Sequence, residues 1–136
     1  SLAELGTKIQ QIFAGNVTEK AKITADSAIA QHPITQAVDG MADTYWQAAY
    51  GQEFDTITLK FPKPQKVSCV VLGEHLPTGQ RIESGEIWAD GSKVSEFTVV
   101  GHKRICRFAP VEVLTLTIKI TASRTEPTLR LLAVYQ

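Results

Sequence analysis

Apolar and polar residues alternate with a period of two through much of the chain after residue 20. The alternation is clearest over residues 56–61 and 114–120, where every second residue is aliphatic or aromatic. Successive side chains of a β-strand point to opposite faces, so this pattern predicts strands with one face in a core and the other in water. A helix cannot place such a pattern on one side, because its period is 3.6 residues.

Other strand-like runs follow the same rule and are separated by turn residues. Pro62 and Pro64 interrupt the chain after the first alternating run, and Asp90 and Gly91 form a dipeptide that is typical of a two-residue hairpin turn. Further strands are expected over residues 22–25, 66–74, 84–89, 94–100, 103–108 and 129–135. About eight short strands, with no helical pattern between them, predict an all-β domain, an antiparallel β-sandwich over residues 20–136.

The first fifteen residues follow a helical pattern instead. Ser1 and Glu4 have the spacing of a capping box. Apolar residues recur on one helical face, at Leu2, Leu5, Ile9, Ile12 and Phe13. Gly6 weakens this helix by about 1 kcal/mol relative to Ala, so the helix needs a surface to lie on, which can belong to another domain. We therefore expect one N-terminal connector helix over residues 1–15.

Composition limits the classes of partner. The chain has 136 residues, of which 43% are hydrophobic, which is enough for one domain with a core. The 14 Lys and Arg residues balance the 14 Asp and Glu residues, so no net charge attracts a polyanion. No apolar run approaches the roughly 20 residues that span a bilayer. We expect neither nucleic acid nor a membrane as a partner.

The two cysteines, Cys69 and Cys106, are too few for a disulfide framework or a four-cysteine zinc site. Each lies in an apolar strand-like run, which predicts two buried thiols. A bridge between them requires that their strands be neighbours.

No catalytic signature is present in the sequence. It contains no phosphate-binding glycine loop, HExxH, GxSxG or CxxC motif. Its three histidines, His32, His75 and His102, stand far apart. We therefore expect no enzymatic activity from this chain.

Oxygen-bearing side chains crowd into a short loop ahead of Trp46. Asp39, Asp43 and Thr44, together with the carbonyl groups of a turn, are ligands of the kind that hold calcium. The alternative is that Asp39 and Thr44 hydrogen-bond the loop's own backbone while Trp46 fills the core.

A second segment carries polar groups at the end of a predicted strand. Glu74 and His75 end that strand, and the following loop leads to Gln80 and Arg81. Planar donors and acceptors at a loop tip suit the hydroxyl groups of a sugar. A second basic loop, which ends at Arg104, can reach the same end of the sandwich. The alternative is that these are ordinary solvated or salt-bridged loop side chains.

Several segments together resemble the discoidin or coagulation factor type C domain. They are residues 37–46 with the pattern DG, three residues, TYW, then 79–84 (GQRIES), 101–105 (GHKRI) and 120–123, with Pro127 and Tyr135. The GQRIES and GHKRI segments, in this order, are more closely similar to the C-terminal domain of family 29 α-L-fucosidases, which is related to family 32 carbohydrate-binding modules. The opening helix is similar to the connector behind the catalytic barrel of those enzymes.

The resemblance implies a jelly-roll-like, galactose-binding-domain-like sandwich that binds terminal sugars with loops at one end, with a structural calcium ion nearby. Asp39 and Thr44 match positions that commonly contribute calcium ligands, and Asp43 is a third candidate. Met41 and Leu131 stand where the family commonly has oxygen donors. Because calcium takes about 6 to 8 oxygen ligands, the loss of two donors predicts weak or absent calcium binding.

For the sugar site, the resemblance implies a His, an Arg, an Asn and a stacking aromatic residue. His75 and Arg81 supply the first two, whereas the predicted sandwich contains no Asn, so binding requires another amide, such as Gln80, or a different geometry. Tyr50 and Trp88 are candidate platforms, although we expect Trp88, which lies in a predicted strand, to belong to the core.

The sequence therefore predicts a non-catalytic carbohydrate-binding or accessory module of an α-L-fucosidase-like glycoside hydrolase. Its expected partners are glycans that end in galactose or fucose, and the catalytic domain of the parent enzyme. The expected ligand-binding residues are Glu74, His75, Gln80, Arg81 and Arg104. The alternative is a structural or protein-interaction domain without sugar affinity. The resemblance alone leads us to expect a secreted or periplasmic protein.

Overall fold

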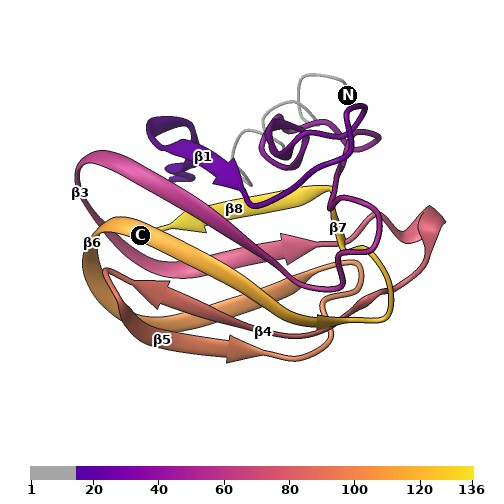
Figure 1. Cartoon of the computed structure of the whole chain (residues 1–136). Helices are drawn as coiled ribbons and strands as arrows, with labels where there is room; N and C mark the ends of the chain where they lie inside the picture. The colour runs from indigo at the N-terminus through magenta and orange to yellow at the C-terminus, as the bar shows by residue number, and fades with distance from the viewer. Residues whose placement is uncertain (1–14) are drawn as a thin grey trace, which may run out of the picture.

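Two long, bent strands organise the domain. β3 (Asp55–Gly73) and β6 (Arg104–Ser123) pair antiparallel along most of their length. In the computed structural model, which describes residues 15–136, both strands curl back at the left of Figure 1. The register of the pair shifts between Lys60 and Gln65, where two prolines lack the N–H group that a ladder needs. Each long strand thereby passes from one layer of the fold to the other.

The shorter strands add to this pair. They are β1 (Lys22–Ala25), β4 (Ile82–Ala89), β5 (Ser92–Phe97) and β8 (Leu131–Tyr135), and they complete a sheet in the order β1-β3-β6-β4-β5, with β8 also paired to β3. A second, two-stranded sheet joins β2 (Trp46–Gln47) to β7 (Thr128–Leu129). Three 3-10 helices lie in the connections: η1 (Thr18–Lys20), η2 (Ile34–Ala37) and η3 (Leu76–Thr78). Because β1 and β8 pair with different halves of bent β3, the strands form a jelly-roll-like antiparallel β-sandwich, as predicted.

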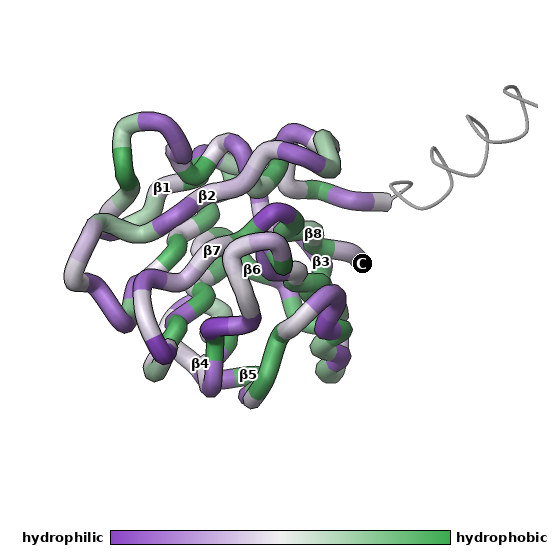
Figure 2. Tube along the Cα trace, turned by 90° about the vertical axis from the view of Figure 1, so that its right-hand side faces the viewer, coloured by the Kyte–Doolittle hydropathy of each residue, from purple (hydrophilic) through white to green (hydrophobic). Residues whose placement is uncertain are grey.

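The alternating residues fill the core. Ile57 and Leu59 of β3 and Leu116 and Ile118 of β6 are each 0% exposed, while the polar residues between them face outward. Trp46 is also 0% exposed, which confirms the interpretation that it fills the core. Figure 2 shows the strands end-on, with β1 and β2 above β3, β6 and β7, and with β4 and β5 below.

Most predicted strands are present, with some changes. The hairpin prediction is confirmed, since Asp90 and Gly91 have φ angles of 47° and 85° and join β4 to β5. The strands expected over residues 56–61 and 66–74 are two halves of one strand, β3. The short strand β2 was not expected. The helix predicted over residues 1–15 lies outside the described residues apart from Gly15, and the domain boundaries remain predictions.

The cysteines lie on neighbouring strands yet form no disulfide. Cys69 pairs with Arg107 across the ladder, and Cys106 pairs with Val70. Since adjacent residues of a strand point to opposite faces, the two thiols lie on opposite sides of the sheet. Cys106 is buried and Cys69 is partly exposed, and burial raises the pKa of both thiols. The prediction of a buried thiol is thus confirmed for Cys106 and wrong for Cys69.

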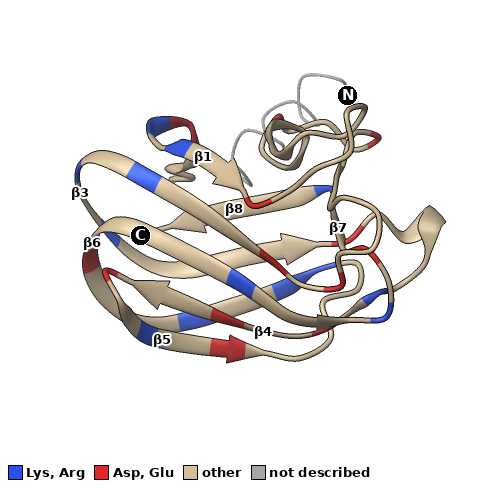
Figure 3. Cartoon of the chain, viewed as in Figure 1, with Lys and Arg blue, Asp and Glu red and all other residues tan. Residues whose placement is uncertain are grey.

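Charged residues of both signs are distributed over both layers and the loops (Figure 3). Within residues 15–136, no helix is long and apolar enough to cross a membrane.

Candidate functional site

Four segments meet at the end of the sandwich to which β3 returns, on the right of Figure 1 and facing the viewer in Figure 2. They are residues 26–54, 74–81, 98–103 and 124–130. Backbone hydrogen bonds join them. The N–H of Ala48 donates to the carbonyl oxygen of Pro127 (3.1 Å), and the N–H of Arg124 donates to that of Arg81 (2.8 Å). We call this region the loop end.

Three aromatic rings stack at the loop end. The ring centroids of His32 and Tyr45 are 3.8 Å apart with an interplanar angle of 20°. Those of Tyr45 and His75 are 3.7 Å apart with an angle of 8°. Tyr45 directly precedes β2, and the N–H of His75 donates to the hydroxyl of Thr128 in β7 (3.1 Å), so the β2–β7 ribbon holds the stack together. All three rings are partly exposed.

A hydrogen bond selects the tautomer of neutral His32, and burial lowers the pKa of His75. The side-chain amide of Gln36 donates to the carbonyl of Gln31, so its Oε1 accepts the Nδ1–H of His32 at 2.9 Å. A neutral His32 therefore keeps Nε2 as an acceptor. The pKa of His75 lies below its usual 6.5, because burial disfavours the imidazolium and because the charges of His32, Arg130 and Arg81 repel it. At neutral pH, His75 thus offers one donor and one acceptor, which suits a hydroxyl group.

Two arginines flank the stack. Arg81 Nη1 donates to the carbonyl oxygen of Glu126 (2.8 Å), and its Nε is buried without a hydrogen bond among the described residues. Arg130 Nη2 donates to the carbonyl oxygen of His102 (2.6 Å). The guanidinium packs against Gly73 so closely that a Cβ atom at position 73 would lie 3.1 Å from Nη2. Backbone carbonyls therefore fix both guanidinium groups, near enough to His75 for their charges to lower its pKa.

Glu74 has a structural position. It is 0% exposed, and its carboxylate accepts the backbone N–H groups of Arg81 (2.7 Å), Ile82 (2.8 Å) and Gly101 (2.7 Å). A buried carboxylate is stable when hydrogen bonds replace its hydration. Glu74 joins two of the loops and cannot touch a ligand at the surface, so we correct its expected role as a ligand-binding residue.

The remaining candidates lie in different surroundings. Gln80 is exposed in the loop after η3, next to Arg81 in sequence. Arg104 is not brought to the ring stack, because its side chain lines a groove with Ser84 and Glu96, between β4, β5 and β6.

The two aromatic candidates also separate. Tyr50 is 76% exposed in the segment between β2 and β3. Trp88 is partly exposed, with Lys119 Nζ 4.3 Å from its ring centroid and its Nε1 donating to Glu86. Its neighbour Ile87 is 0% exposed, so Trp88 faces away from the core, and the prediction that it belongs to the core is wrong.

Three residues of the site were not predicted: His32, Tyr45 and Arg130. The motif that ends in Trp46 includes Tyr45, and alternation places Tyr45 on the face opposite to the buried Trp46. That signal was available in the sequence. Nothing in the local sequence around His32 or Arg130 indicates that they would meet His75.

The loop proposed for calcium hydrogen-bonds to itself. Asp39 accepts the N–H of Met41 (2.9 Å) and the hydroxyl of Thr44 (2.6 Å). These bonds match the alternative interpretation, in which the polar side chains hold their own loop. Asp43 is exposed.

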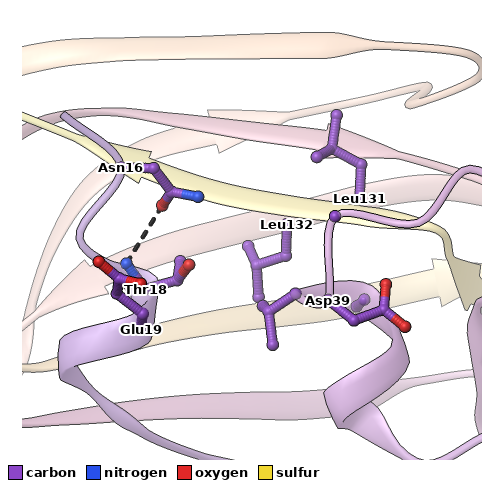
Figure 4. Close-up of a pocket in the computed structure, with 9 residues that line it drawn as sticks. Asn16, Thr18, Glu19, Asp39, Leu131 and Leu132 are labelled. Carbon is purple, nitrogen blue, oxygen red and sulfur yellow. Dashed lines mark hydrogen bonds between the residues drawn. The ribbon is translucent and has the colours of Figure 1, made fainter. Parts of the chain in front are cut away.

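Beside this loop lies a hollow of about 200 Å³, shown in Figure 4. It is lined by Asn16, Thr18, Glu19, Ala37, Val38, Asp39, Gly40, Leu131 and Leu132. Glu19 and Asp39 stand on opposite sides of it, and Leu131 brings a side chain without oxygen. Among residues 15–136, no group of three His, Cys, Asp or Glu side chains is arranged to hold a metal ion. The donor set does not fit calcium, and weak or absent calcium binding stays a prediction.

Solved structures with the same fold include both enzymes and binding modules. A putative α-L-fucosidase from Bacteroides thetaiotaomicron superposes with a TM-score of 0.86 and 22% identity over 97% of this chain, which spans 31% of that protein. Chitosan-binding module 2 of a Paenibacillus sp. IK-5 chitosanase/glucanase, solved with chitotriose, superposes with a TM-score of 0.78 and 21% identity. The match covers 89% of this chain and 100% of the module. The family 32 carbohydrate-binding module of C. perfringens NanJ, solved with galactose, superposes with a TM-score of 0.76 and 21% identity. The match covers 88% of this chain and 96% of the module.

These likenesses confirm the fold that the fucosidase and family 32 resemblance implied, whereas the discoidin assignment stays a prediction. No curated protein matches the sequence. The model of one protein family matches residues 16–129, which is most of the chain. The chain belongs to that family, which is described as Domain of unknown function (DUF7402).

Proposed function

We propose that the chain is a non-catalytic carbohydrate-binding accessory module and that the ring stack with its two arginines is its sugar-binding surface. The observation that carries this proposal is the convergence of His32, Tyr45, His75, Arg81 and Arg130 at one end of the sandwich. Neutral imidazoles and guanidinium N–H groups are the donors and acceptors that read sugar hydroxyls. The likeness to modules solved with galactose and with chitotriose supports the same function.

The expected affinity is low. The groups lie on an open surface and offer few contacts, so we expect dissociation constants on the order of 0.1 to 1 mM, which correspond to roughly 4 to 5.5 kcal/mol. The expected ligands are glycans that end in galactose or fucose. We expect the module to belong to an α-L-fucosidase-like glycoside hydrolase that is secreted or periplasmic, which the similarity to fucosidases supports.

The test is an NMR titration of the chain with methyl galactoside and methyl fucoside. Binding should shift the backbone signals of residues 74–81 and the ring signals of His75. His75→Ala should weaken binding about tenfold or more, because it removes the ring and its hydrogen bonds. Arg107→Gln is the control, since Arg107 is exposed on a different surface, beside Cys69. Equal weakening by both variants, or no response to either sugar, would contradict the proposal.

A second candidate function is that of a purely structural accessory domain. It is favoured by a hollow of about 380 Å³ on the outer face of β3, β6 and β8. Cys69, Val71 and Tyr135 line it, and Ile105, which also lines it, is 43% exposed. An apolar surface of this kind suits a protein contact. In a chain that includes the parent enzyme's catalytic domain, Ile105→Asp should lower the melting temperature only if this face is an interface.

A further inference from the structure

Two guanidinium groups lie near His75, and among residues 15–136 neither of them forms an ion pair with a carboxylate. Arg81 and Arg130 both donate to backbone carbonyls. A carbonyl oxygen fixes an arginine's position but has no net charge, so both cations keep their full charge at the surface. Within the described part of the chain, the ion pairs of the structure instead involve Lys93, on β5.

The carboxylates close to Arg81 are engaged elsewhere. Glu74 lies in the interior, where three backbone N–H groups share its charge. Glu126 accepts the hydroxyl of Thr125, and that hydrogen bond is the main reason that its pKa lies below the usual value. The charge of Arg81 is the last of the causes that lower this pKa. Among the described residues, neither carboxylate forms an ion pair with the Arg81 guanidinium, and Glu126 acts on it only through the weaker Coulombic interaction.

The two guanidinium groups both act on the stack. Arg130 and Arg81 are among the charged groups that lower the pKa of His75, after burial. A further polar ring, that of His102, lies with its Nδ1 3.4 Å from Arg130 Nη2. A neutral sugar would leave this cluster of positive charge unused, whereas an acidic group would gain charge-assisted hydrogen bonds to it.

We propose that the sugar bound at the ring stack carries an anionic group, a carboxylate or a sulfate, which Arg81 and Arg130 bind. This inference rests on the proposed sugar-binding function and names the chemical class of its ligand. Guanidinium groups match the planar geometry of a carboxylate, and their N–H groups can also donate to the oxygens of a sulfate. The half-exposed imidazoles then read the hydroxyl groups of the same sugar ring.

The test compares methyl galactoside, galacturonic acid, galactose 6-sulfate and inorganic sulfate as NMR ligands of the full chain, at about 20 and 200 mM salt. At low salt, at least one acidic sugar should bind about tenfold more tightly than methyl galactoside, and the two acids separate carboxylate from sulfate recognition. Higher salt should reduce this advantage, because it screens exposed charges. Arg130→Gln should lower the affinity for the acidic sugar by a larger factor than the affinity for methyl galactoside and so reduce the advantage, whereas Arg107→Gln should leave both affinities unchanged.

The outcomes separate the two proposals. Equal affinity for neutral and acidic sugars would overturn the anionic class while leaving the proposed sugar-binding function standing. Inorganic sulfate that binds as tightly as galactose 6-sulfate would also overturn it, since the sugar would then contribute nothing. A response to none of the sugars would contradict the sugar-binding function itself. The salt series on the unchanged chain keeps the test valid if Arg130→Gln folds poorly.

Discussion

Glu74→Gln is expected to destabilise the domain far more than the removal of an ordinary surface charge. The Glu74 carboxylate accepts three backbone N–H groups and joins the loop that leads to Arg81 to the loop that contains Gly101. A glutamine has the same shape but only one oxygen. Its amide nitrogen would face either the N–H of Gly101 or the two N–H groups of Arg81 and Ile82.

The size of the effect follows from these bonds. A hydrogen bond to a charged group is worth about 1.5 to 3 kcal/mol, and leaving the partly buried N–H of Gly101 unpaired costs up to about 1 to 3 kcal/mol more. We expect Glu74→Gln to lower the free energy of unfolding by about 3 to 5 kcal/mol, a large share of the 5 to 15 kcal/mol typical of a domain. The melting temperature should fall by roughly 10 to 20 °C.

Urea denaturation at pH 7 measures the change, with Glu83→Gln as the matched control. Glu83 is an exposed residue of β4 and loses the same charge. It should change stability by less than about 0.5 kcal/mol. Hydrogen exchange should show lost protection at Arg81, Ile82 and Gly101 in the Glu74 variant. If both variants unfold at the same urea concentration, the carboxylate does not hold the loops as argued.

The remaining predictions concern metal, the N-terminal segment and the ring stack. Millimolar calcium should shift the melting temperature by less than about 2 °C relative to chelator, because Leu131 removes a donor from a site that needs about six to eight oxygens. A larger stabilisation would place the ligands elsewhere. Deletion of residues 1–15 should leave a folded sandwich that self-associates less than the full chain, as light scattering and circular dichroism would reveal; loss of folding would make this segment part of the core. The pKa of His75, read from its ring protons, should lie below 6.5 and rise in Arg130→Gln but not in Arg107→Gln. An unchanged value in Arg130→Gln would show that this charge does not reach the ring.

The lowered pKa of His75 also determines how the stability of the domain changes with pH. Because folding lowers the pKa of His75, the folded state holds its proton less tightly than the unfolded state does. The contribution of His75 to stability is therefore complete above about pH 6.5, its usual pKa, and is lost as the pH falls through the lower, folded value.

The sheet was predictable from sequence because alternation follows directly from strand geometry. The two strands that carry the clearest alternation, β3 and β6, contain the core residues Ile57 and Ile118. Their full length was not predictable, because Pro62 and Pro64 signal a turn to any local interpretation. In the fold these prolines lie where β3 bends from one layer to the other, and the chain continues as the same strand.

The loop from Glu74 to Arg81 shows why the site was only half predictable. Composition identified it as polar and as the end of a strand, and both conclusions are correct. It could not say which side chains turn inward, and Glu74, the residue with the most acceptor capacity, is the one that the backbone uses. A polar cluster at a strand end serves the fold first, and a ligand can use only the polar side chains that remain exposed, here His75, Gln80 and parts of Arg81.

The ring stack is a consequence of tertiary structure. His32 and Tyr45 lie 13 residues apart in one loop-end segment and His75 lies in another, and the two-residue strand β2 brings the three rings together. That strand exists because Trp46 is buried and pairs with Leu129, which is also 0% exposed. The core residue Trp46 therefore positions Tyr45 on the opposite, outward side, and Tyr45 then orients both histidines. The geometry of the proposed sugar surface is set by packing beneath it, so it depends on residues that no ligand would touch.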